Sequence, residues 1–458
     1  MEAWVKLSIW IGIFGFFKEF RPEDPYITQY MTGPKMNFTS EQVNRVIFPV
    51  ATYTSMIELV FVFLITDWLR YKPVVIVCAF SGVIVQIMLI WCRGVTAMQV
   101  MEVFYGTYCC TEVAYYTYIY AKVDPQYFQQ VTSYMRGSVL SGRFLSSIVS
   151  QIFLFWKIMT IDQLNDLTLV GMLCAFFWAL GLPSVPRSLY FHREVLPVIN
   201  GVIGSPAAST SNGISPHSNG VSPSSPPKTV PLSRSCCSSS SYVLEFLWED
   251  FKFAFTNVYV IKWSAWVALG TCVYLQFMGY VQLLWQNVDK NLTQYNGAVE
   301  AVYTLISASA AFLFGRIALD WKVHGDCLLG VLTLVAGVLV TLSAFATSMI
   351  FCFGVYIVFG TLYHIQMTVA YSEIAKNIKP DSYALVFGVN SLASLIFQTI
   401  LTYTVASEQM FKLPIESQFT VYGVCFIVLG TFYIVKSIFT YLNVYTSRRI
   451  IASKDPSS

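Results

Sequence analysis

Charged residues are scarce in this sequence. Asp, Glu, Lys and Arg make up 12% of its 458 residues, whereas hydrophobic residues make up 55% and the mean hydropathy is +0.58. A soluble domain carries about 25% charged residues. So few charges cannot cover the water-facing surface of a chain this long, which excludes a soluble globular protein. The net charge of +3 is also too small to indicate a nucleic-acid partner.

Motifs for catalysis and cofactor binding are missing as well. The sequence has 4 histidines and 11 cysteines, but no C-x-x-C pair and no His-rich metal spacing. Most of the cysteines lie in or beside apolar runs, where Cys behaves as a small hydrophobic residue. There is no nucleophile–base spacing and no phosphate-binding loop. We therefore expect no metal site, no cofactor, no disulfide framework and no enzymatic activity.

Long apolar runs are abundant instead. A helix that crosses a bilayer needs about 20 apolar residues, and about twelve runs of this kind follow one another. The pattern predicts an all-α membrane protein with the lipid bilayer as its surroundings. The expected spans lie near residues 5–30, 44–66, 73–93, 96–122, 129–156 and 166–184, and then near 260–284, 296–319, 327–346, 348–376, 382–406 and 417–440.

One polar stretch divides these spans into two sets. Residues 205–227 read SPAASTSNGISPHSNGVSPSSPP. A segment with almost no large apolar residues is typical of a disordered linker. The expected domains are an N-terminal six-helix bundle (1–184), a cytoplasmic disordered linker (185–245), a C-terminal six-helix bundle (246–442) and a cytoplasmic tail (443–458).

The two halves resemble each other. The segments VAYYTYIYAKVDPQY (113–127) and VAYSEIAKNIKPDSY (369–383) share their length, the opening Val-Ala-Tyr and the closing Tyr, and both lie in the fourth span of their half. A repeat of six helices joined by a long inner linker is the organisation of a two-bundle transporter. The segment GRIALDWKVHG (315–325) also resembles a loop motif of the major facilitator superfamily. We therefore expect that fold.

The distribution of Lys and Arg predicts the orientation. With both termini in the cytoplasm, the inner loops are richer in these residues than the outer loops, as the positive-inside rule requires. Two glycosylation sequons, at Asn37 and Asn291, then lie outside. In this arrangement Lys18 and Arg21 belong to the outer part of the first span. Glu300 lies at the outer membrane interface.

The fourth span carries acidic and aromatic residues on one helical face. Glu102, Tyr105, Cys109, Glu112 and Tyr116 all share that face at about 3.6 residues per turn. Carboxylates supply charge for an organic cation, and tyrosine rings add cation–π attraction of about 0.5–2 kcal/mol each. This face therefore predicts binding of a cationic substrate or of protons. The alternative is structural ion pairs with neighbouring helices.

Other ionisable residues lie at mid-membrane depth, where they are functional candidates. Glu58 and Arg143 are expected to form a structural ion pair, because an unpaired charge is costly there. Arg143 has Glu102 and Glu112 as alternative partners. His364 is either a proton-coupling group, since its reference pKa is near neutrality, or part of a polar face that lines water. The candidates for proton coupling are thus Glu102, Glu112, Glu58 and His364.

Several motifs together resemble the solute-carrier family that contains the reduced folate carrier and the thiamine transporters. The resemblance covers nearly the whole chain except the linker and the tail. It implies a major facilitator fold and carrier-mediated uptake of a vitamin at the plasma membrane, with a pH-sensitive, proton-linked mechanism. The motifs are GFFKEFRPEDPYITQYMTGPKMNFTSEQV (15–43), IFPVATYT (47–54), TDWLRYKPV (66–74), MQVMEVFYG (98–106), EVAYYTYIY (112–120), YVQLLW (280–285), YNGAVEA (295–301) and ALVFGVN (384–390).

Charge separates the substrates within that family. The folate carrier resembled here has cationic side chains at three positions, which in this chain are Glu112, Gly360 and Gln398. Without these cations, the binding free energy of a folate dianion in a cavity of low dielectric constant would be less favourable by roughly several kcal/mol. The thiamine transporters carry Glu and Gln at the positions of Glu112 and Gln398. The resemblance therefore implies thiamine rather than folate.

Further positions agree with the thiamine branch, and two depart from it. Ala51 stands where those transporters have Trp, and Asp24 stands where they have Glu. These departures leave open a different cationic vitamin, such as pyridoxine. The agreeing positions are Phe48, Glu102, Tyr105 and Asn296, of which Glu102 and Tyr105 also match the folate carrier.

The sequence thus predicts a monomeric thiamine importer that works by alternating access. The thiazolium cation is expected near Glu112 and Tyr116, with Phe48 stacked on a ring and Asn296 bonded to the aminopyrimidine. Reduced folate and pyridoxine are the alternative substrates. A nutrient receptor that does not transport is a second class of function, although intramembrane carboxylates and a duplicated bundle are features that a carrier requires.

Overall fold

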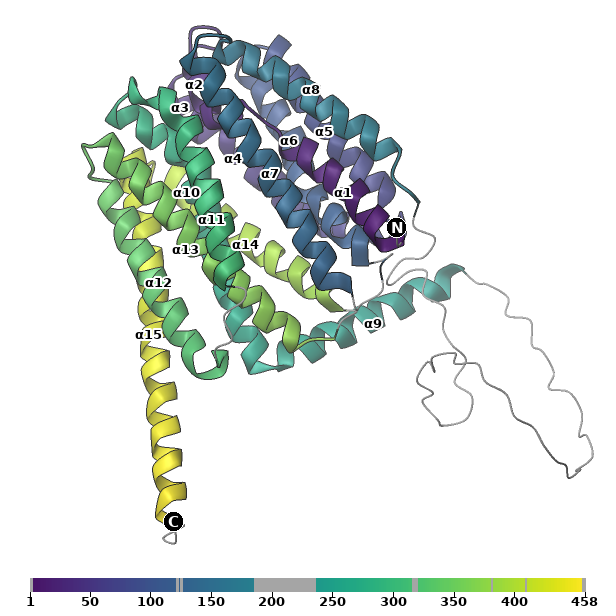
Figure 1. Cartoon of the computed structure of the whole chain (residues 1–458), viewed down its shortest axis with the longest axis vertical. Coiled ribbons are helices and arrows are strands. Elements are labelled where there is room, and N and C mark those ends of the chain that lie inside the picture. Colours follow the sequence, from purple (N-terminus) through teal and green to yellow (C-terminus); the bar gives the residue numbers. More distant parts are fainter. Residues whose placement is uncertain are drawn as a thin grey trace, which may run out of the picture.

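The structure is a computed structural model, which describes residues 3–120, 123, 127–184, 236–314, 320–379, 382–407 and 410–454. Its elements are helices arranged in two groups (Figure 1). The first group comprises α1 (Ala3–Glu19), η1 (Asp24–Tyr26), α2 (Ile27–Thr32), α3 (Ser40–Gln42), η2 (Val43–Ile47), α4 (Phe48–Trp68), α5 (Lys72–Trp91), α6 (Val95–Tyr120), α7 (Phe128–Phe155) and α8 (Ile161–Leu180).

The second group follows residues 185–235, which lie outside the described part. It comprises α9 (Cys236–Thr256), α10 (Val258–Val288), η4 (Leu292–Tyr295), α11 (Asn296–Phe314), α12 (Trp321–Ser343), α13 (Met349–Lys376), α14 (Tyr383–Ala406) and α15 (Ile415–Lys454). We call α1 to α8 the N-half and α9 to α15 the C-half.

Each half has an apolar core of its own. In the N-half, α1 packs against α7 and α8, and α6 packs against α4 and α5. In the C-half, α12 packs along α15, and α10 packs against α13 and α14. The outward surface is also apolar, with Phe61, Phe312 and Val428 at 60%, 60% and 64% exposure. Large exposed apolar side chains of this kind are what a helix presents to lipid.

Ten helices in the described part of the chain are long and apolar enough to cross a membrane. They correspond to ten of the predicted spans. The other two predictions fall on α1 and α6. Helix α1 has only 17 residues, and the 26-residue helix α6 carries Glu102 and Glu112 among several tyrosines. The predicted helical fold is therefore confirmed, but the count of twelve is not reproduced by length and apolarity.

Two prolines interrupt the first predicted span. Helix α1 ends at Glu19, and the chain resumes regular structure only in η1 and α2. Pro22 lies in the gap and Pro25 lies in η1; proline lacks an amide donor and disfavours helix in the residue before it. The interruption brings the charged segment 18–24 into the interior of the N-half.

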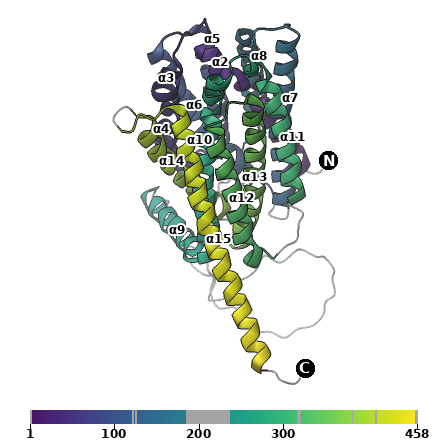
Figure 2. The same cartoon turned by 90° about the vertical axis from the view of Figure 1, so that its left-hand side faces the viewer.

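The linker and the tail differ from the prediction at their edges. Helix α9 begins at Cys236, so the last ten residues of the expected linker 185–245 are helical. Helix α15 continues to Lys454, through most of the expected tail 443–458, and Figure 2 shows it extending past its neighbours. Its 40 residues are longer than a bilayer requires. The rest of the expected linker lies outside the described residues.

Hydrogen bonds between the halves gather at one end of the molecule. The Gln282 side chain donates to the Asp24 carbonyl at 2.8 Å, and the Gln286 amide donates to Thr32 Oγ1 at 3.0 Å. Nearby, Arg45 donates to the Lys412 carbonyl at 3.2 Å. One apolar cluster at this end contains residues of both halves. We call this the closed end.

Candidate functional site

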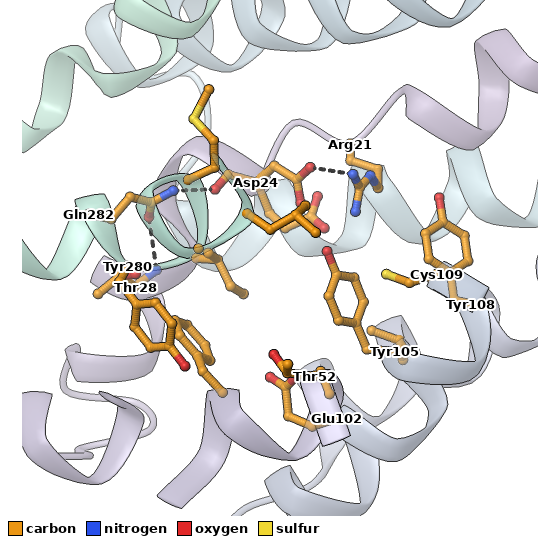
Figure 3. Close-up of a pocket in the computed structure, with 18 of the residues that line it drawn as sticks. Arg21, Asp24, Thr28, Thr52, Glu102, Tyr105, Tyr108, Cys109, Tyr280 and Gln282 are labelled. Atoms are coloured by element: carbon orange, nitrogen blue, oxygen red, sulfur yellow. Dashed lines mark hydrogen bonds and ion pairs between the residues drawn. The ribbon is translucent and has the colours of Figure 1, made fainter. Parts of the chain in front are cut away.

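A cavity of about 450 Å³ lies between the two halves. This volume suits a small organic molecule. The N-half lines it with the segment after α1 and with α4, α5, α6, α7 and α8, and the C-half with α10, α11, α13 and α14. Figure 3 shows part of this lining.

The charged side chains of the lining are mostly acidic. Four carboxylates face two arginines, which leaves an excess of negative charge. A cavity of low dielectric constant strengthens that imbalance. The arrangement therefore favours a cation over an anion. The carboxylates are Glu23, Asp24, Glu102 and Glu300, and the arginines are Arg21 and Arg143.

Both arginines of the lining are already paired with carboxylates. Arg21 Nη2 lies 2.8 Å from Asp24 Oδ2, and Arg143 Nη2 lies 2.8 Å from Glu19 Oε2 (Figure 3 shows the first pair). Glu23 accepts a hydrogen bond from the Gln86 amide at 2.7 Å. Because both arginines are already paired, neither guanidinium is free to bind an anionic substrate.

The carboxylate of Glu102 differs from the paired side chains described above. It projects from α6 into the cavity beside Thr52 (Figure 3), and its exposed fraction is only 5%. Within the described residues, neither a cation nor a hydrogen-bond donor contacts its carboxylate. A buried carboxylate without a partner is costly. It is therefore a group that gains from binding a proton or a cation.

Aromatic rings stand around this carboxylate. The rings of Phe48 and Tyr280 face each other across the two halves at 6.2 Å between centroids, and Tyr105 stacks on Tyr108 at 6.0 Å. All four residues line the cavity. Ala51 lines it as well, three residues after Phe48 on α4, and its methyl group leaves that wall open. The end of the cavity near Glu102 is thus an acidic site with aromatic walls.

Glu112 and Tyr116 lie outside the cavity lining, although they share a helix with Glu102. Glu112 Oε1 forms an ion pair with Lys18 Nζ at 3.0 Å. Lys18 is 1% exposed and also contacts Glu19 at 2.9 Å. The expectation that Lys18 belongs to the outer part of the first span is therefore corrected: the end of α1 points it into the N-half. The carboxylate of Glu112 is therefore already paired with Lys18.

The expected pair of Glu58 with Arg143 is not formed. Glu58 accepts hydrogen bonds from Thr107 Oγ1 at 3.1 Å and from Cys110 Sγ at 3.3 Å, between α4 and α6. Arg143 contacts Glu19 instead, and neither Glu102 nor Glu112 is its ion-pair partner. The reason is the packing of α1 against α7, which places Glu19, the last residue of α1, 2.8 Å from Arg143.

Asn296 and His364 border the cavity without lining it. The Asn296 amide donates to the Pro25 carbonyl at 2.9 Å and so ties α11 to η1 at the closed end. His364 Nε2 lies 2.9 Å from the hydroxyl of Tyr303, which does line the cavity. Both side chains therefore contact the site through another residue.

Several residues of the site escaped the sequence analysis. The sequence predicts Lys18 and Arg21 in the outer part of the first span and Glu300 at the membrane interface, and it does not single out Glu19. Glu300 instead lines the cavity and accepts a hydrogen bond from Tyr356. The available signal was the group of charges inside the first span-length run, since charges at that depth are functional candidates.

The described residues contain no group of three or more His, Cys, Asp or Glu side chains that could hold a metal ion. The two sequon asparagines, Asn37 and Asn291, are exposed near the closed end. The charged and aromatic side chains that line the cavity are carboxylates, arginines, Phe48 and tyrosines.

Comparison with known proteins supports the resemblance seen in the sequence. A sequence model of the family described as "Reduced folate carrier" matches residues 2–421. Thiamine transporter 1 of mouse is 35% identical, with 100% of this chain and 93% of that protein aligned. Thiamine transporter 2 of human is 33% identical, with 100% and 94% aligned. The human reduced folate transporter is 31% identical, with 94% of this chain and 72% of that protein aligned.

Solved structures share the fold. The xylose transporter XylE from E. coli superposes with a TM-score of 0.60 at 10% identity, covering 94% of this chain and 97% of that one. The nucleoside transporter NupG gives a TM-score of 0.57 at 12% identity, with 94% and 98% covered. At these identities the likeness concerns the fold alone.

Proposed function

This chain belongs to the reduced folate carrier family and has the major facilitator fold, and from that premise we propose that it imports thiamine by alternating access. One observation carries the choice of substrate: Glu102 is an unpaired, buried carboxylate in an aromatic cavity with an excess of acidic groups. Thiamine is an aromatic cation, and a cation relieves this unpaired charge. The transporters named thiamine transporter 1 and 2 support the same choice.

The proposed position of the cation differs from the one expected from the sequence. Glu112 is neutralised by Lys18 at 3.0 Å and lies outside the cavity lining, so the thiazolium ring is assigned to Glu102. Phe48 and Tyr280 supply the faces for stacking and cation–π contact. Asn296 acts indirectly in this proposal, because it holds the closed end through Pro25.

Reduced folate is disfavoured by the same charges. Its two carboxylates would meet four others in the cavity, and both lining arginines already have acidic partners. Gln398 lines the cavity without charge. Gly360 leaves no room for a long cationic side chain, because a Cβ there would lie 2.2 Å from the ring of Tyr303.

The substitution Glu102→Gln tests the proposal. It keeps the size of the side chain and removes the charge, so the KM for labelled thiamine should rise about 10- to 100-fold, as expected for a lost hydrogen bond or ion pair to a charged group. Uptake is measured in transfected cells and normalised to surface-labelled protein. The control is Asp166→Asn, which removes an exposed carboxylate of α8 outside the cavity lining.

Competition distinguishes the substrates. Excess unlabelled thiamine should suppress uptake of labelled thiamine in cells that express the wild-type chain, whereas excess reduced folate should not. Uptake of labelled folate or pyridoxine without uptake of thiamine would overturn the proposal. Full thiamine uptake by Glu102→Gln would show that Glu102 does not bind the cation, and that part of the proposal would be wrong.

We also propose that proton movement accompanies transport. Glu102 is the leading candidate, because an unpaired cavity carboxylate holds either a proton or the cation but not both. Glu112, Glu58 and His364 are weaker candidates, since each already has a partner. Exchange of an internal proton for an external cation predicts that uptake rises as the external pH increases. Initial rates that stay flat from mildly acidic to mildly alkaline pH would rule out this coupling.

The proposed location is the plasma membrane, with both termini in the cytoplasm and a monomer as the working unit. The excess of Lys and Arg in the inner loops supports this orientation. Asn37 and Asn291 are exposed near the closed end, which is then the outer end. The cavity of this conformation consequently faces the cytoplasm.

A further inference from the structure

Glu300 is the only carboxylate or basic side chain that the C-half contributes to the described lining of the cavity. It lies on α11, whereas Glu102 lies on α6 of the N-half. The two halves must move against each other during alternating access. A substrate that contacts both acids therefore connects the parts that move.

The carboxylate of Glu300 is held in a fixed orientation with one oxygen free. Oε2 accepts a hydrogen bond from the Tyr356 hydroxyl. The Tyr356 ring is wedged edge-on between Tyr303 and Trp285, at 5.0 and 5.1 Å between centroids. Oε1 has no hydrogen-bond partner among the residues that the structure describes. This oxygen can accept a hydrogen bond from a molecule in the cavity.

The electrostatic surroundings of the two acids differ. Arg143 approaches from the N-half and interacts electrostatically with Glu300, while its own ion pair is with Glu19. No cationic side chain of the described residues forms an ion pair with Glu102. A fixed positive charge is therefore attracted more strongly to Glu102, because Arg143 repels it from Glu300. Glu300 suits a neutral N–H donor, which gains a charge-assisted hydrogen bond without this repulsion.

We propose that Glu300 is a second recognition carboxylate, which accepts a hydrogen bond from the amino group of a neutral aromatic amine while Glu102 binds the cationic ring. This inference rests on the proposed function and deepens it. The substrate class it defines is a molecule with a fixed aromatic cation at one end and an aminopyrimidine-like donor at the other. Such a molecule joins α6 to α11 across the cavity.

Analogue selectivity tests the assignment. The probes are thiamine and oxythiamine, in which an oxygen replaces the amino group of the pyrimidine. Wild type should prefer thiamine by about tenfold in KM, because a carboxylate accepts from the amino group and repels the oxygen. In Glu300→Gln the amide can donate to that oxygen, so the preference should fall to within about twofold. Glu102→Gln should weaken both probes equally, because both retain the cation.

Three further comparisons make the outcome decisive. Asp166→Asn is the control and should keep the wild-type preference. Tyr356→Phe removes only the donor that orients Glu300, so it should reduce the preference even if Glu300→Gln fails to reach the cell surface. An unchanged thiamine–oxythiamine ratio in both Glu300→Gln and Tyr356→Phe would overturn the inference and leave the proposed function standing. A wild-type chain without thiamine uptake would overturn both.

Discussion

At the scale of single residues, the charges at the end of α1 and just after it form a buried network. Lys18 lies between Glu19 and Glu112, and Glu19 also accepts from Arg143. Arg21 joins through Glu19 at 3.6 Å and also pairs with Asp24 at 2.8 Å. A charge removed from water is costly unless it has a partner of opposite sign. The network therefore holds the interrupted segment against α6 and α7 and fixes the wall of the cavity.

Substitution of Lys18 should destabilise the protein strongly. Lys18→Gln leaves Glu19 and Glu112 without their common cation, and breaking a buried pair costs about 3–5 kcal/mol. We expect a clear fall in the thermal unfolding midpoint of the detergent-solubilised protein. Lys35→Gln is the matched control, because the Lys35–Asp162 pair is exposed and worth at most about 1 kcal/mol. Equal midpoints for the two variants would contradict this account.

At the scale of elements, α12 and α15 pack closely through glycines. Gly330 and Gly337 on α12 face Gly423 and Gly430 on α15. A Cβ at Gly337 would lie 2.7 Å from the Ile427 amide nitrogen, so only glycine permits this separation. Small residues allow helices in membranes to approach each other in this way. The pair forms one edge of the C-half.

A large side chain in this contact should force the two helices apart. Gly337→Leu is expected to lower the unfolding midpoint and the yield of folded protein, because the obstructing atoms are backbone and cannot rotate away. Gly354→Leu is the control on α13, since no atom lies within 4 Å of a Cβ built there. The control should behave like wild type. A similar loss in both variants would indicate a general effect of replacing glycine.

Helix α6 shows what periodicity reveals about an element. The spacing of its acids and tyrosines correctly predicted a shared face, and Glu102 and Tyr105 from that face line the cavity. Periodicity does not indicate depth, however. Glu112 lies about 15 Å further along the helix axis, where Lys18 of α1 is its neighbour rather than a substrate.

At the scale of the whole molecule, Tyr26 links the halves at the closed end. It is fully buried, and its hydroxyl accepts from the Gly297 amide at 3.0 Å and donates to the Gln294 carbonyl at 3.0 Å. Both partners belong to the C-half, whereas Tyr26 belongs to η1. These bonds must break when the halves separate at this end. They therefore stabilise one conformation of the transport cycle over the other.

Removal of this hydroxyl should shift the conformational equilibrium. Tyr26→Phe leaves the Gly297 amide unpaired only while the end is closed, at a cost of about 1–3 kcal/mol. The open conformation should then gain population by about tenfold. Distances between spin labels at Lys35 and Lys290, in a cysteine-depleted chain, report this shift. Tyr295→Phe, on the exposed side of η4, should leave the distances unchanged, and a matching shift there would contradict the role of Tyr26.

The sequence by itself determined the membrane class, the helical fold and the family. These properties depend on composition, on the length of apolar runs and on motifs, which are local along the chain. It also made Glu102 a candidate, because a carboxylate within an apolar run is conspicuous wherever the helices lie.

Only the tertiary structure decided which charges remain available to a substrate. Pairing depends on distances between helices that are remote in sequence: Lys18 meets Glu112, Arg143 meets Glu19, and Glu58 meets hydroxyl and thiol groups instead of Arg143. A buried charge is neutralised by the partner that the fold brings to it. Among the described residues, the fold pairs Asp24 with Arg21 and gives Glu23 and Glu300 uncharged hydrogen-bond donors, but it gives Glu102 neither a cation nor a donor.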